Sequence, residues 1–156
     1  MATADVSFYQ INLHNSYRAQ EELECRISEV KNPTIAFIQE PPMPKKRIKY
    51  PSNYENFPVL PKTRVCLFIP KNLNFTQISS LTTENSIVAV GKINSKDVLL
   101  ASIYIPPYTK SIPTWLSSIT EYASSAKMGV LIAGDFNAHS PLWGDCLLYT
   151  SPSPRD

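Results

Sequence analysis

Short apolar runs recur along the chain, and polar residues follow most of them. Continuous or alternating apolar runs of this length are typical of strands, whereas apolar positions three or four apart are typical of helices. We therefore expect strands at residues 6–13, 35–38, 65–69, 75–78, 87–93, 98–105 and 130–133. We expect helices at 16–30, where Leu23 and Ile27 share a face, and at 114–126, where Trp115 and Ile119 do.

The order of these elements is strand, helix, strand, then several strands, then helix and strand. This order is typical of an α/β sandwich with its helices outside. The Pro-rich stretch 41–62 is expected to be a loop, and no domain boundary precedes Trp143. A chain of 156 residues is long enough for one domain with a real core.

Polar side chains lie at or just beyond the ends of several predicted strands: Asn12, Glu40, Tyr104, Asp135 and Asn137. Ligands of α/β sheets bind beyond the carboxyl ends of strands, so these side chains are expected to converge. Each also has a simpler explanation. Asparagine forms turns, a glutamate after a buried strand is usually solvated, and a tyrosine before two prolines is usually a packing ring.

Together, these residue types suit a hard cation and a phosphate. Mg²⁺ takes oxygen ligands, typically one or two carboxylates with waters and substrate phosphate. Glu40 is the better candidate for a direct ligand, and Asp135 for the general base that positions a water for attack on phosphorus. Asn12 and Asn137 would orient the ligands without adding charge. Tyr104 would donate a hydrogen bond to a phosphate oxygen.

With their neighbours, these residues resemble the motif set of the endonuclease/exonuclease/phosphatase superfamily, in particular the endonuclease domain of non-LTR retrotransposon polyproteins. The matching segments are QINL at 10–13, SYRA at 16–19, IQEP at 38–41, SIYIPP at 102–107, GDFNAH at 134–139 and PLWG at 141–144. The last segment is a continuation that the retrotransposon branch shows and other branches usually lack.

This resemblance implies a four-layer α/β/β/α sandwich of two mixed sheets flanked by helices. It implies phosphodiester cleavage that depends on Mg²⁺, or on Mn²⁺ in its place, and that nicks target DNA to leave a 3′-hydroxyl for reverse transcription. Glu40 would hold the metal with Asn12 beside it, while Asp135, Asn137 and Tyr104 would act at the scissile phosphate. The implied partners are DNA and a reverse transcriptase domain of the parent polyprotein. Another phosphodiesterase or phosphatase of this superfamily, or a catalytically dead nucleic-acid-binding fragment, stays open as an alternative.

The resemblance also implies a longer domain than residues 5–145. Family members continue to a Ser-Asp-His motif whose histidine contacts the phosphate, and neither His14 nor His139 stands in such a motif. We therefore expect a domain that is incomplete at its C-terminus and impaired in activity. Residues 146–156 resemble translated sequencing-adapter sequence and are expected to be an unstructured, non-native tail.

Composition and charge bear on the binding partners and the cellular location of this protein. The net charge of +2 does not by itself establish a nucleic-acid partner. The basic cluster Lys45, Lys46, Arg47 and Lys49 would either follow DNA phosphates or form a solvated loop. The three cysteines show no pairing pattern, and neither a signal peptide nor an apolar membrane-spanning stretch is visible. We therefore expect an intracellular protein without a membrane partner, and the resemblance implies a nuclear location for an intact element.

Overall fold

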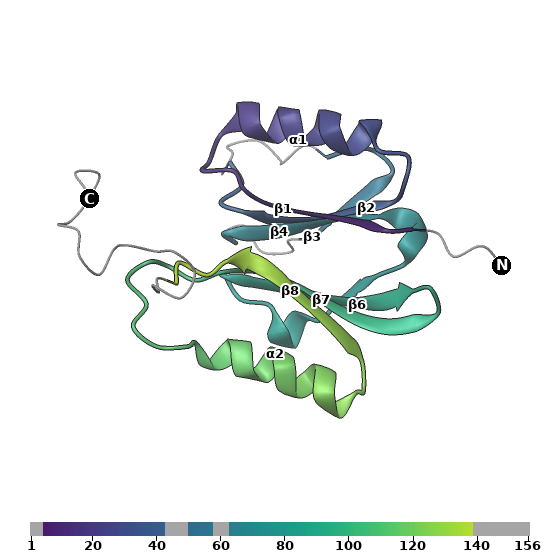
Figure 1. Ribbon diagram of the computed structural model, residues 1–156. Coiled ribbons are helices and arrows are strands. Elements are labelled where there is room, and N and C mark those ends of the chain that lie inside the picture. Colours follow the sequence, from purple (N-terminus) through teal and green to yellow (C-terminus); the bar gives the residue numbers. More distant parts are fainter. Residues whose placement is uncertain (1–4, 43–49, 58–62, 139–156) are drawn as a thin grey trace.

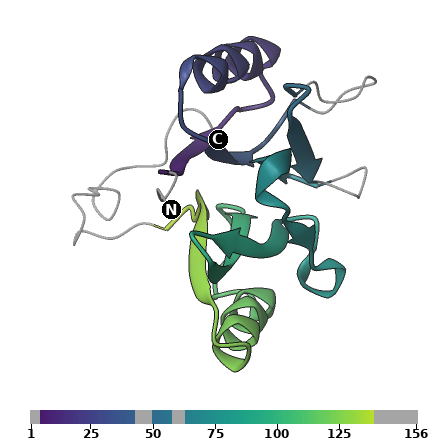
Figure 2. The same cartoon turned by 90° about the vertical axis from the view of Figure 1, so that its right-hand side faces the viewer.

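The computed structural model describes residues 5–42, 50–57 and 63–138. Two sheets lie face to face, helix α1 (Tyr17–Glu29) covers the outer face of the first, and helix α2 (Thr114–Ser125) covers the outer face of the second (Figures 1 and 2). The four layers confirm the predicted α/β/β/α sandwich.

The first sheet has the strand order β1-β2-β4-β3. Its strands are β1 (Ser7–Asn12), β2 (Thr34–Gln39), β3 (Tyr54–Phe57) and β4 (Val65–Pro70). Helix α1 links β1 to β2, which run parallel, whereas β4 is antiparallel to both of its neighbours. Every residue of β2 and β4 is buried, as expected of continuous apolar runs at the centre of a sheet.

The second sheet has the strand order β5-β6-β7-β8. Its strands are β5 (Thr76–Gln77), β6 (Ser86–Ile93), β7 (Lys96–Tyr104) and β8 (Gly129–Asp135). Helix α2 links β7 to β8, which again run parallel, and the other pairs are antiparallel. Both sheets are therefore mixed, as predicted. Single turns of 3-10 helix at Lys71–Leu73 and Ser79–Leu81 complete the described elements.

The hydrophobic core lies mainly between the sheets and beneath α1. Phe37 and Phe68 are its largest fully buried side chains, and Leu23 and Ile27 of α1 pack onto the same cluster. A second, smaller cluster fills the space between α2 and its sheet, centred on Ile119. The two βαβ units thus have separate helix contacts and share one inter-sheet core, which fixes the ends of their strands relative to one another.

The sequence-based prediction is wrong in one segment and untested in others. Residues 54–57 were expected within a loop, but they form strand β3, because pairing with β4 buries Tyr54 at the edge of the sheet. The cluster Lys45 to Lys49 and the tail 146–156 lie outside the described residues. No helix within the described ranges is long and apolar enough to cross a membrane.

Candidate active site

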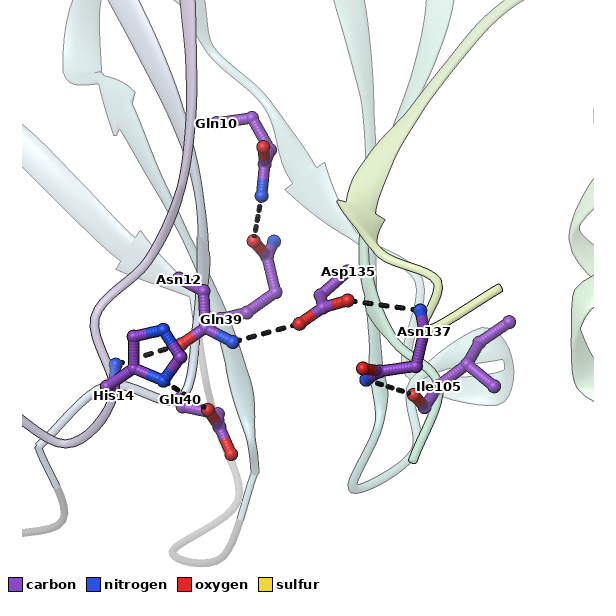
Figure 3. A network of polar contacts seen from close by, with 8 residues as sticks. All are labelled: Gln10, Asn12, His14, Gln39, Glu40, Ile105, Asp135 and Asn137. Atoms are coloured by element: carbon purple, nitrogen blue, oxygen red, sulfur yellow. Dashed lines mark hydrogen bonds and ion pairs between the residues drawn. The ribbon is translucent and has the colours of Figure 1, made fainter. Parts of the chain in front are cut away.

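The parallel strand pairs of both sheets end at the same side of the sandwich. The last residues of β1 and β2, Asn12 and Gln39, are register partners, and so are Tyr104 and Asp135 at the ends of β7 and β8. A side-chain hydrogen bond then joins the sheets, since Asn12 Nδ2 donates to Asp135 Oδ2 at 3.0 Å (Figure 3). Residues far apart in the sequence therefore meet at the carboxyl ends of the strands, as predicted.

Asp135 has a hydrogen-bond donor at each carboxylate oxygen. Besides the Asn12 amide, the backbone N–H of Asn137 donates to Asp135 Oδ1 at 3.1 Å. The Asn137 side chain is held in turn, because its Nδ2 donates to the carbonyl of Ile105 at 2.8 Å. These contacts fix the orientation of the carboxylate before any ligand arrives.

Glu40 lies on the other side of Asn12. Its carboxylate is 3.5 Å from His14 Nδ1, and the His14 backbone N–H donates to Asn12 Oδ1 at 2.8 Å (Figure 3). The backbone N–H of Glu40 donates to the carbonyl of Arg64 at 2.7 Å, which anchors this residue to the start of β4. Glu40 and Asp135 thus flank the Asn12 amide.

The backbone around the site is strained. His14, Asn15, Glu40 and Asn137 all have positive φ angles, between 43° and 57°. Left-handed backbone is costly for residues other than glycine and persists only where the surroundings enforce it. Here the enforcing contacts are the hydrogen bonds just described and one from the Asn15 N–H to the Glu40 carbonyl at 2.9 Å.

Tyr104 completes the predicted set. Its side chain is buried, and burial, the negative charge of Glu40 and a hydrogen bond with Glu40 raise the pKa of its phenol, against the lowering effect of Arg64. The phenol therefore stays protonated at neutral pH and acts as a hydrogen-bond donor, here toward Glu40. The five side chains that we expected to converge, Asn12, Glu40, Tyr104, Asp135 and Asn137, all gather at this end of the sheets.

A buried polar chain beneath the site is absent from the sequence-based prediction. Gln10 Nε2 donates to Gln39 Oε1 at 2.6 Å, and Gln39 Nε2 donates across the sheets to Ser102 Oγ at 3.1 Å. The Ser102 hydroxyl then donates to the Ile38 carbonyl at 3.3 Å. Gln39 and Ser102 are both fully buried. In the sequence, this chain of contacts is signalled by a polar residue in each of two mostly apolar strands, Gln39 in β2 and Ser102 in β7.

Replacing Gln39 by leucine is expected to lower stability and disturb Glu40, its neighbour in the chain. The change leaves Ser102 Oγ without its donor and removes one of the hydrogen bonds that join the two sheets. An unsatisfied buried group costs about 1–3 kcal/mol, so the unfolding midpoint should fall by roughly 3–10 °C. Gln77→Leu on β5, at the far edge of the second sheet, is the matched control. Equal midpoints for the two variants in thermal unfolding would contradict this role.

The donor chemistry at the site fits a hard cation with few protein ligands. Among the described residues, no group of three or more His, Cys, Asp or Glu side chains is placed to hold a metal ion. The available donors are the Glu40 and Asp135 carboxylates and the Asn12 amide oxygen. Mg²⁺ is commonly bound by one or two carboxylates with waters and a substrate phosphate, so this set is compatible with it.

Comparisons with known proteins agree with this architecture. A family described as endonuclease-reverse transcriptase matches residues 98–147. The solved endonuclease domain of TRAS1, a telomere-specific non-LTR retrotransposon, is 26% identical with a TM-score of 0.68, and the match covers 86% of this chain and 60% of that one. A humanized D. rerio TDP2 with 14 mutations is 17% identical with a TM-score of 0.59, covering 90% of this chain and 66% of that one. Curated protein sequences gave no match.

The chain therefore has the fold of the nucleases and phosphodiesterases of the endonuclease/exonuclease/phosphatase superfamily. In sequence and structure the chain resembles the endonuclease domain of a non-LTR retrotransposon, the resemblance that its motifs predicted. The chain spans 60% of the length of the TRAS1 structure that it matches.

Proposed function

We propose that this site hydrolyses phosphodiester bonds of DNA with the help of Mg²⁺, or of Mn²⁺ in its place. The observation that carries the proposal is the continuous contact from Glu40 through His14 and Asn12 to Asp135, which joins two carboxylates from different sheets. Two pre-oriented carboxylates beside a buried tyrosine donor suit attack on a phosphate better than they suit structural support.

Each residue has a proposed role that follows from its contacts. Glu40 and the Asn12 amide oxygen would hold the metal ion, which when bound supplies a positive charge beside the phosphate oxygens. Asp135, oriented by two donors, would accept a proton from the attacking water. Tyr104 would donate its phenolic hydrogen to a phosphate oxygen as negative charge develops there. Cleavage of the bond between phosphorus and O3′ would leave a 3′-hydroxyl.

The partner assignments belong to the same proposal. The resemblance to TRAS1 supports DNA as the substrate and a parent protein that also carries a reverse transcriptase domain. It also supports a nuclear location for that parent protein. The basic residues Lys45, Lys46, Arg47 and Lys49 are proposed to contact DNA phosphates.

Supercoiled plasmid DNA tests this function directly. With protein in excess, we expect slow conversion of supercoiled to nicked circles in Mg²⁺ or Mn²⁺, and none in EDTA. The expected end groups are a 3′-hydroxyl and a 5′-phosphate, which a polymerase extension assay detects. Nicking that EDTA leaves unchanged would contradict the metal-dependent mechanism. DNA binding without any nicking over the whole time course would favour the nucleic-acid-binding alternative.

A further inference from the structure

Arg64 lies at the site although no motif pointed to it. It directly precedes β4, whose first residue, Val65, is the register partner of Gln39. The Arg64 carbonyl accepts the Glu40 backbone N–H at 2.7 Å, so Arg64 is fixed opposite the candidate metal ligand. The antiparallel pairing of β2 and β4 therefore places the positively charged Arg64 at the edge of the sheet where the carboxylates lie.

The Arg64 side chain reaches across to the second sheet. Its guanidinium carbon is 5.7 Å from the centroid of the Tyr104 ring, within the range of a cation–π contact. Tyr104 is 6% exposed, whereas Arg64 is exposed to solvent. The ring is therefore buried, while the arginine that contacts it remains accessible to solvent.

Three charged side chains act on the Tyr104 phenol: the Arg64 guanidinium and the carboxylates of Glu40 and Asp135. Glu40 and Asp135 both act to raise the pKa of this phenol, and Arg64 acts to lower it. None of the three ion pairs among the described residues includes Arg64. A guanidinium has five donors in a fork that matches phosphate oxygens. An exposed arginine beside a buried ring, included in none of these ion pairs, is therefore available to bind an anion.

We propose that the Arg64 guanidinium binds a phosphate oxygen of the DNA strand held at this site. The inference rests on the proposed function and adds a substrate contact to it. Two carboxylates repel an approaching phosphodiester, and the positive charge of Arg64 offsets part of that repulsion. The contact with the Tyr104 ring holds the guanidinium near the phenol, so it also sets where the phosphate lies relative to that hydroxyl.

The test measures DNA binding in EDTA, where neither metal binding nor cleavage contributes. Binding of a fluorescently labelled duplex to the full chain is followed by anisotropy between about 50 and 200 mM salt. Arg64→Ala should weaken binding roughly fivefold and reduce the slope of log K against log salt by about 0.9, the value for one lost phosphate contact. Arg64→Lys, which keeps the charge, should retain most of the slope.

The control is Lys92→Ala, which removes an equal charge. Lys92 pairs with Asp97 at 2.7 Å, at the end of β7 opposite Tyr104, so its loss should leave the slope unchanged. Unfolding midpoints identify any variant that fails to fold, and Arg64→Gln then replaces the alanine variant. An unchanged slope in a folded Arg64→Ala or Arg64→Gln protein would overturn this inference alone. Absence of DNA binding by the unaltered chain would overturn the DNA substrate itself, and this inference with it.

Discussion

Asp135→Asn is expected to reduce the rate of plasmid nicking by about 10²–10⁴-fold, the usual contribution of a general base. Both carboxylate oxygens accept a hydrogen bond, from Asn12 Nδ2 and from the Asn137 N–H. An amide nitrogen in place of either oxygen cannot accept that bond, and an amide cannot take a proton from water at neutral pH. The rate is measured in a single-turnover time course with protein in excess.

Asp97→Asn is the matched control for this prediction. Asp97 is an exposed residue paired with Lys92, and it is the second residue of β7, the strand that neighbours the one carrying Asp135. Its replacement should leave the nicking rate within about twofold, because weak surface ion pairs contribute little to stability. Equal rates for unaltered protein and a folded Asp135→Asn variant would remove Asp135 from the proposed chemistry.

Gly134→Ala is expected both to destabilise the fold and to displace Asp135, the next residue in the chain. Gly134 and Ile103 are register partners on β8 and β7, and a Cβ at Gly134 would meet the Ile103 carbonyl oxygen and lie 2.8 Å from Ile103 Cγ1. The strands must separate to admit the methyl group, at a cost of about 1–3 kcal/mol or more. We expect the unfolding midpoint to fall by roughly 3–10 °C, with a large loss of nicking.

Gly129→Ala, on the same strand, separates local crowding from a general effect of glycine replacement. A Cβ at Gly129 would be 3.6 Å from the Asp97 carbonyl oxygen, an ordinary van der Waals distance. This variant should unfold within about 2 °C of the unaltered protein. If both alanine variants unfold at the same temperature as the unaltered chain, close packing of β7 on β8 does not position Asp135.

Much of the architecture was predictable because the hydrophobic pattern is consistent with the fold. The apolar runs that became β2 and β4 are buried along their whole length, and the helical stripe through Leu23 and Ile27 packs into the core. The convergence of Asn12, Glu40 and Asp135 was predictable because strands in parallel βαβ units end on one side of a sheet. Their catalytic roles remain predictions.

Other features depend on tertiary pairing that no local pattern shows. Strand β3 is short and forms because β4 offers an open edge, which buries Tyr54. Arg64 reaches Tyr104 only through the antiparallel register of β2 with β4 and the packing of one sheet on the other. The bond from Gln39 to Ser102 likewise crosses between sheets. The last two contacts combine residues from both halves of the chain, so sequence periodicity does not reveal them.

The central claim is that the ends of the parallel strands hold a divalent metal ion through Glu40. Calorimetric titration of the full chain with Mn²⁺ tests it most directly, with Glu40→Gln as the test variant. Glu22→Gln, on the exposed face of α1 in a pair with Arg26, is the matched control. Loss of outer-shell partners alone lowers metal affinity about 10–100-fold, so loss of a ligand should lower it at least as much. We predict that the control binds Mn²⁺ like the unaltered chain and that Glu40→Gln binds it at least tenfold more weakly. Equal Mn²⁺ affinity in all three folded proteins would contradict the account.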